Sequence, residues 1–124
     1  MSTDSREQGL RVLEEMLGPE VANSTRKRWL EISPDFEHYV VEFLAGDIWK
    51  REGLDRRTRS LITIGALTAL GRSRGLELNI RMALKNGASP EEINETLLHL
   101  APYAGFPATW DALEIAHRVF KQDV

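Results

Sequence analysis

Apolar residues recur at helical spacing along most of the chain, and no stretch shows the strict alternation of a half-buried strand. The densest pattern runs from Gly46 to Leu70, GDIWKREGLDRRTRSLITIGALTAL, which opens with arginines and ends in apolar residues. In its second half the apolar positions cover most of a helix circumference, as is typical of a buried helix. We therefore expect a central helix after the capping residue Asp55, with the rest of the chain packed around it.

Local start and stop signals place the other helices. Gly18 and Pro19 end a first helix. Ser89, Pro90 and Glu92 form the clearest helix start, with a cap, a proline at the first position and a capping box. The segment 21–32 gives no firm prediction. The pattern predicts an all-α fold of about six helices: residues 5–17, 34 to about 44, the central helix, 76–86, 90 to about 100, and 108–120.

Composition narrows the classes of function. A chain of 124 residues suits one domain, residues 1–124. Its formal charge of −3 argues against nucleic acid as the partner. The absence of cysteine removes disulfides, thiolate metal sites and thiol nucleophiles. The polar N-terminus, MSTDSREQ, has no apolar signal core, and no apolar run approaches a membrane span, so we expect a cytoplasmic protein.

The three histidines do not predict a metal site. His38, His99 and His117 each fall in an expected helix, without a close pair or an HExxH-type spacing. We expect structural or surface roles for them.

Arginines flank the expected central helix. Arg56, Arg57 and Arg59 fall in its first turn, where cations oppose the helix dipole, and Arg72 and Arg74 follow its end. These side chains either form ion pairs with protein carboxylates or bind an anionic ligand. Arg59 is the main candidate for ligand binding because it borders the apolar run.

The segment from Tyr103 to Asp111 joins the last two expected helices. A helix N-terminus offers free N–H groups to an anion, and Tyr103 and Trp110 are candidates for a pocket wall. Asp111 is a candidate for moving a proton, although an acidic residue in a first turn also stabilises the helix dipole.

Several motifs together resemble the 4-carboxymuconolactone decarboxylase family. They are GDIWKREGLDRRTRSLITI at 46–64, ALG at 69–71, RMA at 81–83, NG at 86–87, EEI at 91–93 and YAGFPA at 103–108. The resemblance covers most of residues 36–120. It implies an all-α fold related to the alkylhydroperoxidase D-like proteins. It also implies a homo-oligomer, a trimer or a hexamer built as a trimer of dimers.

The resemblance also implies an activity. The parent reaction uses no cofactor and removes CO₂ from a small anionic lactone in the β-ketoadipate route of aromatic breakdown. Such a site needs an anion pocket and a group that moves a proton. The candidates are Asp111 and Asn79 as catalytic residues, and Arg59, Arg81, Tyr103 and Trp110 as substrate-binding residues.

The chain departs from the family pattern at the presumed pocket. Asn79 stands where the family usually has a histidine, Ala104 where a cysteine is common, and Trp110-Asp111 where an Asn-His pair is usual. Three readings follow: the parent decarboxylase, a divergent lyase, isomerase or hydrolase of another small acid, or a non-catalytic oligomer that binds a small molecule or a protein. The missing CxxC pair excludes the dithiol peroxidase chemistry of related proteins.

Overall fold

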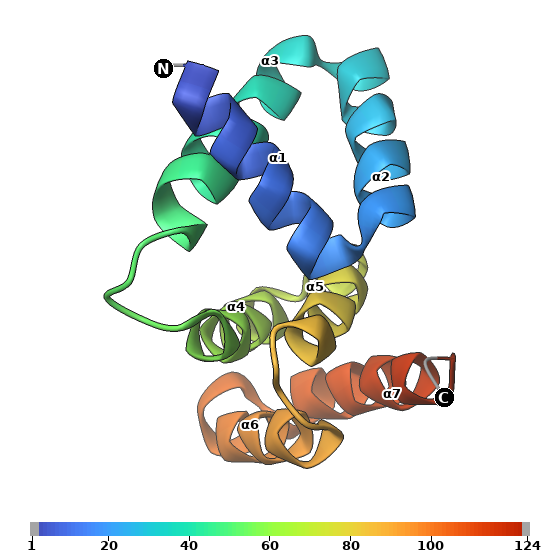
Figure 1. The fold of residues 1–124 in the computed structure, drawn as a ribbon. Helices are drawn as coiled ribbons and strands as arrows, with labels where there is room; N and C mark the ends of the chain where they lie inside the picture. Colours follow the sequence, from blue (N-terminus) through green and yellow to red (C-terminus); the bar gives the residue numbers. More distant parts are fainter. Residues whose placement is uncertain (1–2, 123–124) are drawn as a thin grey trace. The chain divides into compact units, whose positions relative to one another are not determined.

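The computed structural model describes residues 3–122, and its regular elements are all helices, seven α-helices and one π-helix (Figure 1). The predicted all-α fold is therefore confirmed for this part of the chain. The chain divides into two compact units, Met1–Asp55 and Arg56–Val124, and each is described by itself.

Four helices build the first unit: α1 (Thr3–Leu17), α2 (Pro19–Ile32), α3 (Pro34–His38) and the π-helix η1 (Tyr39–Trp49). The segment 21–32, for which there was no firm prediction, lies within helix α2. Ser33 caps α3 by accepting a hydrogen bond from Phe36 N. The helix that starts there does not end at Gly46, however, because it continues as η1 to Trp49.

Two glycines let the backbones of α1 and η1 approach each other. A Cβ atom built on Gly9 would lie 1.8 Å from the carbonyl oxygen of Val41, and one on Gly46 would lie 2.2 Å from that of Ser5. Neither position has room for a side chain, because the neighbouring atom is backbone and cannot swing away. The contact between α1 and η1 therefore depends on glycine at both positions.

A buried ionic cluster connects α1, α2 and α3. Glu37 is 1% exposed, and its carboxylate accepts hydrogen bonds from Arg6 Nη2 at 2.9 Å and Arg26 Nε at 3.1 Å. Burial raises the pKa of Glu37, but the hydrogen bonds and charges of both arginines outweigh that effect and hold the pKa below its usual value. Nearby, Glu42 is also buried, with His38 Nδ1 2.5 Å from its Oε2.

The second unit consists of α4 (Arg56–Leu70), α5 (Ser73–Lys85), α6 (Pro90–Ala104) and α7 (Phe106–Gln122). Helix α4 contacts the other three, and α5 and α6 each pack on α7 (Figure 1). The predicted helices all occur here, although α5, α6 and α7 are each longer than expected. The core residues include Ile64, Leu76, Ile80, Ile93, Leu97, Ile115 and Val119.

The expectation that α4 is buried nearly all round is wrong for the single chain. Its buried residues are Ser60, Ile64 and Thr68, which lie on one stripe at spacings of four. Ile62 and Leu70 are 56% and 65% exposed. A helix covered by three neighbours still leaves one face open, and the apolar residues on that face are surface residues of the chain.

Helix α6 begins as its sequence predicts. The Ser89 hydroxyl accepts from Glu92 N at 3.1 Å, and the Glu92 carboxylate accepts from Ser89 N at 2.9 Å, which completes the capping box. Glu92 also forms an ion pair with Arg57 in the first turn of α4. For Arg57, a protein carboxylate is therefore the observed partner.

We expect Gly9→Ala to destabilise the protein by about 3 kcal/mol, because its new methyl group must displace the η1 backbone. Urea unfolding followed by circular dichroism measures the change. Gly53→Ala is the matched control, since a Cβ there meets nothing within 4 Å. Equal stability of the two variants would show that the helices separate without cost.

The lowered pKa of Glu37 predicts a pH dependence of stability. The unfolded carboxyl titrates near its ordinary value of 4.5, and the folded one titrates lower. The contribution of Glu37 is thus complete above pH 4.5 and is lost as the pH falls through the folded pKa.

Glu37→Gln should remove this dependence and cost about 3 kcal/mol at pH 7, because Arg6 and Arg26 lose their buried partner. Urea unfolding at pH 3–7 measures both effects. Glu31→Gln, which breaks the exposed pair with Arg28, should change stability by less than about 0.5 kcal/mol. A steep acid limb that survives in Glu37→Gln would contradict the assignment.

Candidate functional site

Three helices of the second unit enclose a cavity of about 140 Å³. It lies at the C-terminal end of α4, the N-terminal end of α5 and the first turns of α7. Its walls combine an apolar part with four polar side chains. The lining residues are Leu67, Thr68, Gly71, Arg72, Ser73, Leu76, Ala108, Asp111, Ala112 and Ile115.

A tight turn brings Arg72 to this cavity. Gly71 has a φ of 71°, a left-handed conformation that favours glycine, and Arg72 N donates to the carbonyl oxygen of Leu67 at 2.9 Å. Arg72 is also the N-cap residue of α5, but its side chain makes no capping hydrogen bond. The cavity thus lies at an uncapped helix N-terminus, which carries positive potential.

Thr68 has an unusual environment. The residue is 3% exposed, and its hydroxyl has no hydrogen-bond partner among the described residues. An unpaired buried hydroxyl costs free energy, and most such groups in proteins do find a partner. At the other end of the same stripe, the Ser60 hydroxyl accepts from Asn86 Nδ2 at 2.9 Å.

Asp111 and Arg72 bring opposite charges to the cavity from different helices. Both residues are exposed, although they line the cavity. Within residues 3–122, neither side chain forms an ion pair or a side-chain hydrogen bond with another residue. Both are therefore available to a ligand, and Asp111, the predicted proton-transfer residue, is placed in a cavity.

Asn79 and Arg81, the two predicted site residues on α5, are not among the lining residues. Asn79 Nδ2 donates to the carbonyl oxygen of Gly75 at 2.8 Å, one turn earlier in its own helix. Arg81 hydrogen-bonds to Gln122 at the end of α7 and lies 3.9 Å from Glu77. Gln122 is eleven residues from Asp111, about 16 Å along the helix, so Arg81 and Asp111 do not meet.

The predicted aromatic wall does not line this cavity either. Trp110 is 69% exposed, and its Nε1 donates to Glu114 Oε1 at 3.4 Å. Tyr103 is 79% exposed and lies 5.5 Å from the His99 ring, centroid to centroid. Arg59 lies in the first turn of α4, at the opposite end of that helix from Thr68 and Gly71.

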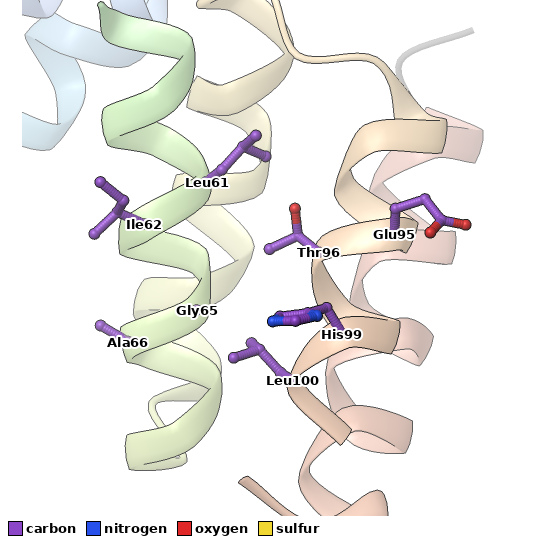
Figure 2. Close-up of a pocket in the computed structure, with 8 residues that line it drawn as sticks. All are labelled: Leu61, Ile62, Gly65, Ala66, Glu95, Thr96, His99 and Leu100. Atoms are coloured by element: carbon purple, nitrogen blue, oxygen red, sulfur yellow. The ribbon is translucent and has the colours of Figure 1, made fainter. Parts of the chain in front are cut away.

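A second hollow, an open groove of about 590 Å³, lies between α4 and α6 (Figure 2). Its lining is mostly apolar, with Leu61, Ile62, Gly65, Ala66 and Leu100 beside the polar Glu95, Thr96 and His99. Figure 2 shows Thr96, His99 and Leu100 pointing from α6 toward α4. A Cβ on Gly65 would lie 3.6 Å from Leu100 Cδ1, an ordinary van der Waals contact, so the groove has room for a methyl group at this position.

Sequence reasoning missed Thr68. A threonine inside an apolar helical run is indistinguishable from a core residue until its hydrogen-bond partners are known. Arg72 carried a signal, since it follows the end of the central helix, but nothing in the sequence placed it near Asp111. The two positions meet because α7 packs across the turn between α4 and α5.

Residues 3–122 contain neither a cluster of metal-ligating residues nor a membrane-spanning helix. No group of three or more His, Asp or Glu residues is placed to hold a metal ion there. No helix in that range is long and apolar enough to cross a membrane.

The cavity can bind a small anion and exchange a proton with it. Arg72 and the N-terminus of α5 supply positive potential, and the Thr68 hydroxyl can donate a hydrogen bond. The carboxyl group of Asp111 can donate or accept a proton.

Comparison with known proteins points to one family. The profile of the Carboxymuconolactone decarboxylase family matches residues 34–118. A 4-carboxymuconolactone decarboxylase from Acinetobacter baylyi is 40% identical over 114 residues, which cover 92% of this chain and 85% of that protein.

Two further relatives widen the comparison. A nitrosuccinic acid decarboxylase from Metarhizium robertsii is 31% identical over 95% of this chain and 82% of its own length. An uncharacterised 15.0 kDa protein of Paracoccus denitrificans is 38% identical over 75% of this chain and 71% of its own length. The two named relatives are decarboxylases of chemically different small acids.

The unpaired hydroxyl predicts opposite effects for two buried threonines. Thr68→Val should stabilise the fold by about 1 kcal/mol, because it removes a buried group that has no partner. Thr109→Val should cost about 1 kcal/mol, because the Thr109 hydroxyl donates to the carbonyl oxygen of Leu97 at 3.2 Å. Urea unfolding measures both, and a destabilised Thr68→Val would show that the hydroxyl has a partner.

Proposed function

We propose that this chain, which belongs to the carboxymuconolactone decarboxylase family, decarboxylates a small anionic organic acid without a cofactor. The substrate is 4-carboxymuconolactone or a related acid. With 4-carboxymuconolactone the reaction belongs to the β-ketoadipate route of aromatic breakdown. The observation that carries the proposal is one cavity lined by Asp111, Arg72 and Thr68.

The chemistry requires little from the protein. Decarboxylation breaks a C–C bond, releases CO₂ and leaves the electron pair on carbon. A conjugated lactone or a nitro group takes up that pair by resonance, so no cofactor is needed as an electron sink. The enolate or nitronate that results must then gain a proton, at the lactone carbon next to the carbonyl group or at the carbon that bears the nitro group. We assign this proton to the Asp111 carboxyl, and solvent returns the proton to Asp111.

An altered substrate is the favoured form of this proposal. The named relatives act on a carboxylactone and on nitrosuccinic acid, so the family scaffold serves more than one acid. This chain also has Asp111 and Asn79 where the family pattern usually has histidines. A carboxyl group at position 111 keeps a proton-transfer group in the cavity but changes its length and charge.

We further propose that the chain forms a homo-oligomer, a trimer or a hexamer. The support is the number of large apolar residues exposed in the second unit. They include Ile62, Leu70, Leu98, Tyr103, Phe106 and Trp110, which are 56–79% exposed. Large apolar side chains exposed in this number favour burial against another protein surface, here a second copy of the chain.

The purified protein should release CO₂ from 4-carboxymuconolactone or from nitrosuccinate. Asp111→Asn should lower kcat at least about 100-fold, because the amide cannot supply the proton. Formation of CO₂ and of the decarboxylated product measures both rates.

Glu91→Gln is the control for the loss of a carboxylate, since Glu91 is exposed in the first turn of α6, away from the cavity. It should keep full activity. If Asp111→Asn turns over as fast as Glu91→Gln, Asp111 is not the proton donor. If the folded wild type releases CO₂ from neither acid, the function proposed here is wrong for both substrates.

Light scattering at micromolar concentration should give three or six times the mass of one chain. Ile62→Glu should lower that mass, because it places a charge on the exposed apolar face of α4. Val21→Glu, at an exposed apolar position of α2, should leave the mass unchanged. A monomeric wild-type mass would contradict the oligomer.

A further inference from the structure

We propose that Thr68 and Arg72 bind the carboxylate that a dicarboxylic substrate retains while its other carboxylate leaves as CO₂. This inference rests on the proposed decarboxylase function. It assigns a binding role to two side chains that the family pattern does not single out.

Thr68 gives the first reason. Thr68 lines the cavity, and its buried hydroxyl has no hydrogen-bond partner among the described residues. The hydroxyl is therefore a donor that makes no hydrogen bond within the chain. A carboxylate oxygen would form the strongest hydrogen bond with such a donor, because hydrogen bonds to charged groups are stronger than those between neutral groups. The hydroxyl oxygen of Thr68 is itself inaccessible. A threonine in a helix populates two χ1 rotamers, and the rotation of about 120° from one to the other would bring the hydroxyl to a ligand.

Arg72 gives the second reason. It lines the same cavity, has no ion-pair partner in residues 3–122, and lies at the uncapped N-terminus of α5. The guanidinium group matches the fork of a carboxylate, and the helix N-terminus adds positive potential. Three separate features of the cavity therefore favour one anionic group.

The position of Asp111 decides which carboxylate is bound. Thr68 and Arg72 reach the cavity from α4 and the α4–α5 turn, whereas Asp111 reaches it from α7. A substrate held at one end by Thr68 and Arg72 presents its other end to Asp111, which protonates the enolate or nitronate that the loss of CO₂ leaves. A cavity of about 140 Å³ suits a carboxylate on a short carbon chain rather than a drug-sized ligand.

Succinate, a dicarboxylate that cannot undergo this reaction, separates binding from turnover. Titration calorimetry should show that the wild type and Thr68→Ser bind succinate alike. Thr68→Val should weaken binding about tenfold or more, because a methyl group replaces the donor. Thr68→Val is also expected to be the more stable protein, so weaker binding cannot be attributed to a damaged fold.

Arg72→Gln should weaken succinate binding at least as much, while Arg74→Gln should not, because Arg74 is exposed on the same helix turn and does not line the cavity. Equal affinity of the wild type, Thr68→Val and Arg72→Gln overturns the subsite. So does a wild type that binds no succinate at about 10 mM. Neither outcome tests the decarboxylase function, because the assay of CO₂ release tests that function independently.

Discussion

The packing of α4 against its three neighbours is the constraint from which the second unit follows. Ile64 is fully buried at the centre of the stripe that faces them, with Ser60 one turn before it and Thr68 one turn after. Both polar residues are buried by that packing, but only Ser60 receives a partner, Asn86 of the α5 C-terminus. The end of α4 that bears Thr68 is therefore where the unit has both a cavity and an unused donor.

The sequence predicted local structure well because its signals are local. The capping box of Ser89 and Glu92 and the proline start at Pro90 both occur as expected, since each depends on residues a few positions apart. It did not predict the π-helix or the contacts of Gly9 and Gly46, which arise where α1 meets η1. Those features depend on which backbone lies opposite, and periodicity carries no such information.

The same difference between local and tertiary signals explains which residues of the candidate site were predicted from the sequence. Asp111 was predicted from its place at the start of a helix as well as from the family resemblance, and it lines the cavity. Tyr103 and Trp110 were predicted from the same segment, and Asn79 and Arg81 from the resemblance. Other contacts or exposure account for where these four side chains lie. Thr68 could not be found, because its significance is the absence of a partner, which only the packed helices reveal.

Stability and binding make opposite demands on Thr68. A fold selected for stability alone gains by replacing an unpaired buried hydroxyl with a methyl group of the same shape. Retaining the hydroxyl has a purpose only if something outside the chain completes its hydrogen bond. Arg72 and Asp111 line the same cavity, and they are the groups that an anionic, proton-accepting substrate requires. With the binding role proposed above, the cost at Thr68 belongs with the chemistry of the cavity rather than with the packing of the core.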